Sequence, residues 1–331
     1  MMPHKICVIT VTYSNRWKFL SNVLTRVLSM PGVGSVIVIN NASDYVIDDR
    51  ITDERITLLN NAENKGSAGG YNQGIQFALK NVDADFIWLL DDDNLPNEDA
   101  LLELIKHWQT IKGGNNEKAL FCLREDRRAH VNIARGEGGQ RYYLVPDNFL
   151  GFSLFRILTN QLYKFQDRFK KATANLPYAK IPYVPYGGLF MHKQLVETIG
   201  YPREDFFLYV DDSEYTYRIT QSGAAIYLIP SAKVQDIDQS QGINYKKKLF
   251  RSALLDLWSF RTYYHVRNRM YFYSRVAIKN KFMFNINKAL YLGFLRLIST
   301  ISNKRSAYKK LLIAVSDGLN GKLGKAGQDK F

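Results

Sequence analysis

Residues 86–93 read Phe86-Ile87-Trp88-Leu89-Leu90-Asp91-Asp92-Asp93, a continuous apolar run that ends in three carboxylates. Five large hydrophobic residues in a row, followed by acids and Pro96, are typical of a strand buried on both faces of a mostly parallel sheet. The acids then lie at the carboxyl end of that strand, the edge where open α/β sheets bind their ligands. The stretch therefore predicts both a sheet and the position of a site.

Adjacent carboxylates repel one another unless positive charge lies among them, and a hard divalent cation is a common partner. The triplet therefore predicts Mg²⁺ or Mn²⁺, bound together with a diphosphate. The alternative is an acidic loop before a helix that begins near Asn97-Glu98-Asp99, where acidic side chains favour the helix dipole.

The residues before this stretch alternate between strand and helix patterns. Strands are expected at 5–12, 35–40 and 56–59, and apolar residues at helical spacing run from Trp17 to Leu28 and again from Ile75. Such alternation predicts an α/β fold with a mostly parallel sheet flanked by helices. Each expected strand ends in polar residues at the same edge of the sheet.

A glycine-rich segment, Asn64-Lys65-Gly66-Ser67-Ala68-Gly69-Gly70-Tyr71-Asn72-Gln73-Gly74, opens the second helical pattern. Its spacing matches neither the dinucleotide-binding fingerprint nor a P-loop. The small residues could let a nucleotide approach the backbone, or they could simply let the helix pack closely. Both interpretations stay open.

A second apolar run breaks into acids at Phe206-Phe207-Leu208-Tyr209-Val210-Asp211-Asp212-Ser213-Glu214-Tyr215. A carboxylate beside another acid and apolar rings has a raised proton affinity, which suits a general base. The alternative is a helix that begins with acidic residues and has no catalytic role.

The region between the two acidic runs has no clear periodicity. Residues 112–139 are expected to be loop and strand, and residues 141–185 to be irregular. The aromatic residues of this second stretch could line an acceptor groove or a mobile lid, although an ordinary core is the expected use of most of them. They are Tyr142, Tyr143, Phe149, Phe152, Phe155, Tyr163, Phe165 and Phe169.

Composition is that of an ordinary globular protein, with 331 residues of which 46% are hydrophobic and 23% charged. No signal peptide is apparent, and no stretch reaches the roughly 18 to 20 uncharged apolar residues of a membrane-spanning helix. The two cysteines have no metal-ligand spacing, so buried, reduced thiols in a cytoplasmic protein are expected at Cys7 and Cys122. The histidines are expected to be structural; they are His4, His107, His130, His192 and His265.

The net charge of +14 is concentrated in the C-terminal part of the chain. From Gln241 to Phe331 there are 19 Lys or Arg and 3 acidic residues, whereas the other 240 residues hold 26 basic and 28 acidic ones. From Lys246 onward apolar residues alternate with cations, as in amphipathic helices on an anionic membrane surface. Packing on the first domain with a solvated basic face is the alternative, and a nucleic-acid partner would also suit the pattern.

Taken together, these motifs resemble family 2 glycosyltransferases, above all the galactofuranosyl- and rhamnosyltransferases of bacterial surface polysaccharide synthesis. The resemblance extends over about residues 5–275, and its strength lies in the order and spacing of the motifs. They are Thr12-Tyr13, Asn40-Asn41-Ala42-Ser43, Asn64 to Gly74, Asp91-Asp92-Asp93, Gly187-Gly188-Leu189-Phe190, Phe206 to Glu214 and Tyr263-Tyr264-His265-Val266-Arg267-Asn268-Arg269.

The resemblance implies a GT-A fold over residues 1–240 and a basic, helical, membrane-associating region over 241–331. Residues 1–110 would hold the nucleotide sugar, and 111–240 the acceptor and the base. Asp212 would be the base, while Asp211 and Glu214 would hold acceptor or sugar hydroxyls. The implied metal ligands are Asp91, Asp93 and Asp236. The implied nucleotide-sugar residues are Thr12, Tyr13, Arg16, Asn40, Asn64, Gly69, Gly70 and Asp92.

The chain departs from the family pattern at three points. Asn40 stands where Asp is usual, and it can hydrogen-bond a base edge without adding charge. The loop at 12–16 is one residue longer, which leaves the role of Arg16 open. The histidine that commonly follows the base is absent from 231–238, so either Asp236 replaces it as an oxygen ligand or the first acidic cluster and the diphosphate hold the metal alone.

The resemblance implies an inverting glycosyltransferase in which Mn²⁺ or Mg²⁺ stabilises the departing diphosphate while Asp212 takes the acceptor's proton. UDP-galactofuranose is the first choice of donor, with dTDP-rhamnose and UDP-hexopyranoses as alternatives. The acceptor would be a glycan or a lipid-linked molecule at the inner face of the cytoplasmic membrane. The competing hypotheses are a nucleic-acid-binding protein, against which the paired acidic strand ends argue, and a catalytically idle scaffold. The oligomeric state is not predicted.

Overall fold

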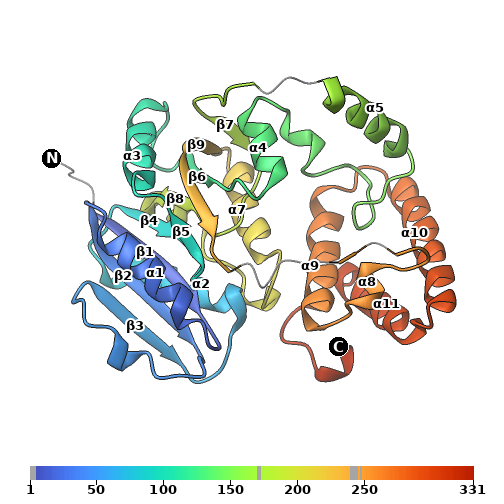
Figure 1. Ribbon diagram of the computed structural model, residues 1–331, viewed down its shortest axis with the longest axis horizontal. Helices are drawn as coiled ribbons and strands as arrows, with labels where there is room; N and C mark the ends of the chain where they lie inside the picture. Colours follow the sequence, from blue (N-terminus) through green and yellow to red (C-terminus); the bar gives the residue numbers. More distant parts are fainter. Residues whose placement is uncertain (1–4, 170–172, 239–244, 247) are drawn as a thin grey trace. The chain divides into compact units, whose positions relative to one another are not determined.

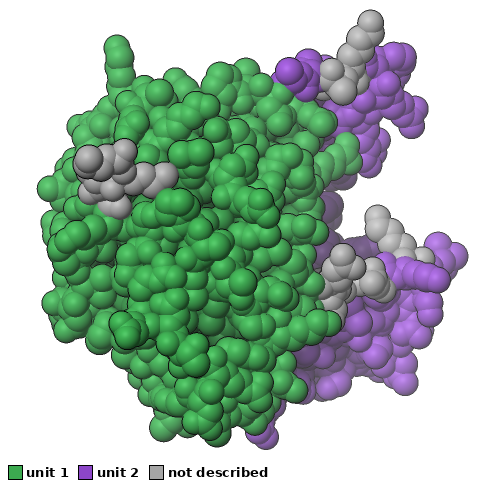
Figure 2. Space-filling model, turned by 60° about the vertical axis from the view of Figure 1, so that its left-hand side comes forward, with its two compact units in different colours: residues 1–139, 175–207, 211–242 green, residues 140–174, 208–210, 243–331 purple. Residues whose placement is uncertain are grey.

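The computed structural model describes residues 5–169, 173–238, 245–246 and 248–331. The chain forms two compact units, shown in different colours in Figure 2. Unit 1 comprises residues 1–139, 175–207 and 211–242, and unit 2 comprises 140–174, 208–210 and 243–331. The break at 242 lies close to the expected boundary at 240. Residues 140–174 and 208–210, which the sequence pattern assigns to the first domain, instead belong to unit 2.

Unit 1 is built on a nine-stranded sheet in the order β3-β2-β1-β4-β8-β6-β9-β5, with β7 also paired to β9 (Figure 1). The strands β3, β2, β1 and β4 run parallel, as predicted. β8 is antiparallel to both β4 and β6, so the sheet is mixed beyond this point. The strands are β1 Ile6–Thr12, β2 Val33–Asn41, β3 Ile56–Asn61, β4 Phe86–Leu89, β5 Asn94–Pro96, β6 Lys118–Leu123, β7 Ala179–Ile181, β8 Leu189–His192 and β9 Ala225–Asp236.

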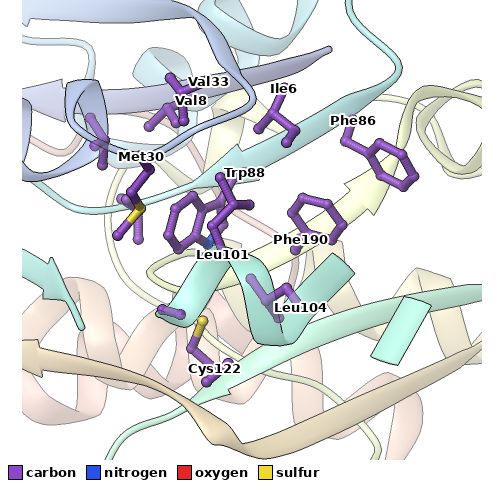
Figure 3. Close-up of a cluster of buried hydrophobic side chains, with 14 of the residues drawn as sticks. Ile6, Val8, Met30, Val33, Phe86, Trp88, Leu101, Leu104, Cys122 and Phe190 are labelled. Atoms are coloured by element: carbon purple, nitrogen blue, oxygen red, sulfur yellow. The ribbon is translucent and has the colours of Figure 1, made fainter. Parts of the chain in front are cut away.

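Helices flank this sheet and close its core. Trp88 of β4 and Phe190 of β8 lie beside Leu101 and Leu104, which come from the covering helix α3 (Figure 3). Trp88 is fully buried, as expected of a strand covered on both faces. The helices of unit 1 are α1 Trp17–Leu28, α2 Gly66–Asn81, α3 Ala100–Thr110, α4 Arg128–Ala134, α6 Lys193–Ile199 and α7 Asp211–Gln221.

Unit 2 is helical, as predicted for the basic C-terminal region. α9 and α11 pack closely at Gly318, where a Cβ atom would lie 2.1 Å from the carbonyl oxygen of Arg267. None of the described helices is both long and apolar enough to cross a membrane. The helices of unit 2 are α5 Arg156–Phe169, α8 Ala253–Asp256, α9 Phe260–Val276, α10 Lys281–Ile301 and α11 Arg305–Leu319.

Two expectations for the middle of the chain were wrong. The segment 112–139 contains the helix α4 besides strand β6, and the segment 141–185 contains the helix α5. Among the eight aromatic rings expected mostly in a core, Phe149 is buried, whereas Phe155, Phe165 and Phe169 are exposed. Phe165 and Phe169 are exposed because α5 packs none of its residues into a core, and Phe155 lies just before this helix.

Candidate functional site

The three aspartates 91–93 lie between the ends of β4 and β5, beside the carboxyl end of β1. β1 and β4 are parallel neighbours with Ile9 opposite Leu89. Three positions further along the chain, Thr12 at the end of β1 and Asp92 in the turn after β4 also meet. The Thr12 hydroxyl donates to Asp92 Oδ2 over 2.7 Å, and both side chains are buried.

Arg16, whose role the sequence left open, joins three carboxylates. Its Nε donates to Asp92 Oδ1 at 2.8 Å, and its terminal nitrogens donate to Asp93 Oδ2 at 2.7 Å and Asp238 Oδ2 at 2.6 Å. Burial lowers the pKa of Arg16, but the carboxylates together raise it above the ordinary value. The ring of Tyr13, which is predicted to bind the nucleotide sugar, has its centroid 5.4 Å from the Arg16 guanidinium. Both oxygens of Asp92 are thus engaged within the protein.

The other predicted metal ligands lie around the same cluster. The Tyr71 hydroxyl is 2.8 Å from Asp91 Oδ1, and burial raises the pKa of Asp91. Asp236 accepts a hydrogen bond from Asn94 at 2.6 Å and pairs with Arg124. Burial raises the pKa of Asp236, Arg124 lowers it, and the negative charge of Asp93 raises it further.

The donor set is suited to a hard divalent cation. The pKa of Asp93 is raised by burial and by the negative charge of Asp91, and Arg16 and Arg124 only partly oppose this. Among the described residues, no group of three or more His, Cys, Asp or Glu side chains is arranged as a complete metal site. Mg²⁺ typically takes one or two carboxylates and completes its shell with substrate phosphates and water. Asp91 and Asp93 fit that pattern, with Asp93 also paired with Arg16 and Asp236 with Arg124.

The second acidic group opens α7, where the helix N-terminus favours negative charge. Asp211 is buried and accepts a hydrogen bond from Ser67 Oγ at 2.8 Å. Burial, followed by the charge of Asp212, raises the pKa of Asp211. Burial also raises the pKa of Asp212, while the Ser213 N–H and hydroxyl, both directed at Asp212 Oδ1, oppose the shift.

The two acidic groups act on one another. The charge of Asp91 contributes to the raised pKa of Asp212, although the two residues are far apart in sequence. Tyr71, which contacts Asp91, packs its ring 4.2 Å from that of Tyr186. Burial raises the pKa of Tyr186, and the charges of Asp211 and Asp212 raise it further. The structure therefore brings both predicted clusters to one buried locality of unit 1.

The glycine-rich segment is held by Asn41, the neighbour of the predicted Asn40. The Asn41 amide donates to the carbonyl oxygen of Gly66 at 2.9 Å and to Asn64 Oδ1 at 3.1 Å. Asn40 instead donates to Asn60 at 2.7 Å, between the ends of β2 and β3. Asn64 thus takes part in forming the start of α2.

The glycines of this segment are explained by close packing. Gly66 has a φ of +72°, and a Cβ atom there would lie 1.8 Å from the Phe207 carbonyl oxygen. A Cβ atom on Gly70 would lie 2.6 Å from Val11 Cγ1 of β1, and one on Gly69 would meet the Lys65 side chain. Contact of Gly69 and Gly70 with a nucleotide sugar stays a prediction.

Glu214 faces its own helix. Its Oε2 lies 3.4 Å from Arg218 Nε, and burial raises its pKa while Arg218 lowers it.

Cys7 and Cys122 are free and buried, and burial raises the pKa of both thiols. The described histidines belong to no metal-binding group, and His4 lies outside the described residues.

Several residues of the site were missed in the sequence. Tyr71 and Ser67 lie inside the glycine-rich segment, whose composition gives no sign of their contacts with the aspartates. Asp238 follows Asp236 by two positions, in the segment 231–238 that lacks a histidine. No sequence motif marks Arg124 or Asn41 as a site residue, because the residues that they contact are distant in sequence.

Comparison with known proteins identifies related sequences and folds. Residues 7–200 match the sequence model of a family described as Glycosyl transferase family 2. The chain is similar to dTDP-rhamnosyl transferase RfbF of Shigella flexneri, with 22% identity over 327 residues, 98% of each chain. It is also similar to galactofuranosyltransferase GlfT1 of Mycolicibacterium smegmatis, with 25% identity over 223 residues, 66% of each chain.

Solved structures share the fold at low sequence identity. A structure of GalNAc-T7 with UDP, GalNAc and Mn²⁺ matches with a TM-score of 0.54 and 14% identity, over 82% of this chain and 50% of that one. Mannosyltransferase PcManGT from Pyrobaculum calidifontis, in complex with GDP-Man and Mn²⁺, matches with a TM-score of 0.50 and 14% identity, over 96% of this chain and 88% of that one.

Proposed function

The chain belongs to glycosyl transferase family 2 and has the GT-A fold, and from this premise we propose that it is an inverting, metal-dependent glycosyltransferase with Asp212 as the base. The observation that carries the proposal is that α2 contacts both acidic groups: Ser67 donates to Asp211 at 2.8 Å and, one turn later, Tyr71 donates to Asp91 at 2.8 Å. Transfer needs the base and the diphosphate site close together. A binding module or an idle scaffold would not need two buried acidic groups to meet.

Asp212 is suited to take a proton from an acceptor hydroxyl. Its Oδ1 is held by the two hydrogen bonds from Ser213, which orients the carboxylate and leaves Oδ2 to accept the proton. Burial raises the pKa of Asp212 towards neutrality, which strengthens it as a base. A single base that activates the acceptor on the face opposite the leaving group gives displacement with inversion at the anomeric carbon.

Asp91 and Asp93 would hold the metal ion together with the donor diphosphate, and the ion supplies charge stabilisation for the leaving group. Arg16 keeps Asp92, Asp93 and Asp238 together by its three-way ion pairing. Asp211 would hold a sugar or acceptor hydroxyl, with Ser67 orienting one of its oxygens. Glu214 is paired with Arg218 on α7, so it would contribute to sugar or acceptor binding less directly than Asp211.

The proposed donor is UDP-galactofuranose, with dTDP-rhamnose and UDP-hexopyranoses as the alternatives. Similarity to a galactofuranosyltransferase supports the first and similarity to a rhamnosyltransferase along the whole chain supports the second. The acceptor would be a glycan or lipid-linked molecule of bacterial surface polysaccharide synthesis.

The activity is tested with purified protein, Mn²⁺, a panel of nucleotide sugars and a glycan acceptor. Asp212→Asn should abolish transfer, a loss of about 10³-fold or more, while keeping the donor-induced rise in melting temperature. Ser213→Ala, which removes only one of the bonds to Asp212, serves as the graded control. Transfer by Asp212→Asn at the native rate would contradict the proposal.

We further propose that unit 2 binds the inner face of the cytoplasmic membrane. It holds 25 Lys or Arg against 5 Asp or Glu, whereas unit 1 holds 20 against 26. Two of its helices also carry exposed apolar stripes with intervals of four, three and four residues. In α5 the stripe is Leu158, Leu162, Phe165 and Phe169, each 60% to 76% exposed. In α10 it is Leu290, Phe294, Leu297 and Ile301, each 46% to 58% exposed.

Cationic surface together with exposed apolar stripes supports an anionic bilayer as the partner. Native protein should co-sediment with phosphatidylglycerol vesicles at low salt and much less with phosphatidylcholine vesicles. Phe165→Glu with Phe169→Glu should weaken that binding, whereas Val46→Glu with Leu102→Glu, on exposed apolar residues of unit 1, should not. Stronger binding to single-stranded nucleic acid than to the anionic vesicles would contradict the membrane proposal.

A further inference from the structure

The backbone that leads into Asp211 and Asp212 is strained. Phe207, Tyr209 and Val210 have φ angles of +64°, +64° and +66°. Residues with a Cβ atom rarely adopt this left-handed region, and a β-branched residue such as Val210 is disfavoured there most. With a ψ of −63°, Phe207 also lies near the uncommon, strained γ-turn conformation. Such a path persists only where surrounding structure holds it.

Within unit 2, Asn268 of α9 holds this path. Its side-chain nitrogen donates to the carbonyl oxygens of Leu208 at 2.8 Å and Tyr209 at 2.9 Å. An asparagine amide has two N–H donors, so both are used on consecutive carbonyl groups of the strained segment. Asn268 is completely buried, so water does not compete for these bonds.

The orientation of the Asn268 amide is set by Arg267. Arg267 Nε donates to Asn268 Oδ1 at 2.8 Å, which turns the amide nitrogen towards the loop. Arg267 is itself buried, donates to the Gly324 carbonyl oxygen at 2.6 Å and lies over the Tyr264 ring. The close approach of Gly318 of α11 to the Arg267 carbonyl group completes this support.

We propose that Asn268, oriented by Arg267, is a positioning residue for catalysis. By holding the Leu208 and Tyr209 carbonyl groups, it fixes the path through the left-handed residues Tyr209 and Val210. It thereby sets the direction in which the chain enters α7 at Asp211, and so the orientation of Asp212. The inference rests on the proposed role of Asp212 as the base. It gives unit 2 a part in the chemistry in addition to membrane binding.

The test compares Asn268→Ala with Asn287→Ala. Asn287 of α10 is a matched control, because it is also buried and bonds backbone groups of a loop, Asp147 and Leu154, that does not lead to the aspartates. Asn268→Ala should lower kcat about 10- to 100-fold while KM for the donor changes less than about threefold. Asn287→Ala should lower the melting temperature similarly with kcat nearly unchanged.

A second substitution tests the strain itself. Glycine adopts positive φ freely, so Val210→Gly should recover part of the kcat lost in Asn268→Ala. Asn268→Asp, which keeps the acceptor for Arg267 but has no donor for the two carbonyl groups, carries the same test should Asn268→Ala not fold. Native kcat in Asn268→Asp or Asn268→Ala, equal kcat losses in the 268 and 287 variants, or failure of both 268 variants to fold while Asn287→Ala folds would each overturn the proposal.

Failure of the positioning role and failure of the base assignment give different results. Should Asp212→Asn keep native activity, the role of Asp212 fails whatever the 268 variants do. Should Asp212→Asn be inactive while both 268 variants keep native kcat, only the positioning role of Asn268 fails.

Discussion

Arg16 is the residue on which the first acidic cluster depends. It is 7% exposed and ion-pairs with Asp92, Asp93 and Asp238, so its removal leaves carboxylates buried without a counter-charge. Taking one partner from a buried ion pair costs far more than the pair gains, because the remaining charge stays desolvated. Both Asp92 oxygens already accept hydrogen bonds from Arg16 or Thr12, and contact of Asp92 with a nucleotide sugar stays a prediction.

Arg16→Met should therefore lower the free energy of unfolding by about 3 to 5 kcal/mol, measured by urea denaturation. Arg55→Met is the control, because the side chains of the Arg55–Asp53 pair are 39% and 32% exposed, so water screens the pair and the loss should be much smaller. Adding Asp92→Asn to Arg16→Met should recover part of the loss. Equal losses for the two arginine variants would show that Arg16 does not compensate buried charge.

The pH dependence of catalysis also depends on a single residue, Asp212. Burial raises the pKa of Asp212 to about 6, and the protonated form cannot accept a proton from the acceptor. The rate should therefore fall about tenfold per pH unit below pH 6 and level off above it, because only the ionised fraction is active. Measuring kcat between pH 4.5 and 8.5 checks this, and a rate independent of pH over that range would argue against Asp212 as the base.

At the scale of elements, the site exists because strand register places distant residues together. The pairing of Ile9 with Leu89 brings Thr12 to Asp92, and the packing of α2 on β1 brings Tyr71 to Asp91. This helix approaches the sheet closely because Gly70 and Gly74 face Val11 and Ile9 with no side chain between. Helix position and site geometry are therefore linked.

Gly70→Ala should displace α2 and lower the free energy of unfolding by about 1 to 3 kcal/mol, because the new methyl group overlaps Val11. In Gly293→Ala, where the helix α10 leaves open space around the glycine, stability should instead rise by about 0.5 to 1 kcal/mol. The double variant Gly70→Ala with Val11→Ala should regain part of the loss. Thermal unfolding of all three variants measures these changes. An unchanged stability in Gly70→Ala would refute the close-packing explanation.

At the scale of the molecule, the two units differ in charge and in the task proposed for each. Unit 1 contains both acidic clusters and a net negative charge, whereas unit 2 is strongly basic and carries the exposed apolar stripes. A donor with a diphosphate and a divalent cation should therefore stabilise the protein through unit 1.

A ligand at 100 times its dissociation constant stabilises the native state by about 2.7 kcal/mol. The nucleotide sugar that the protein uses should accordingly raise its melting temperature by several degrees in the presence of Mn²⁺. EDTA should remove the metal-dependent part of the rise. Asp93→Ala should lose the same part, while Phe165→Glu with Phe169→Glu should keep it. An Mn²⁺-independent rise, unchanged in Asp93→Ala, would contradict Asp93 as a metal ligand.

The sequence alone determined the alternating strand and helix order, the parallel N-terminal strands, the position of both acidic groups and the basic helical C-terminal region. These features depend on local periodicity and on apolar runs ending in polar residues, which a chain carries in any context. The same reasoning was wrong about α5, where it predicted an irregular segment with most aromatic rings in a core. This helix buries none of its residues, so its aromatic residues do not mark a core-facing side.

Only the tertiary structure decided what each charged residue contacts. Arg16 and Asp238 are 222 positions apart, and Asn268 meets residues about 60 positions before it, at separations where sequence spacing carries no distance information. Strand register, close helix packing and left-handed backbone angles set those meetings. Such contacts arise from the packing of whole elements. No sequence motif therefore predicts that Arg16 lies among the aspartates or that Asn268 holds the loop before Asp211.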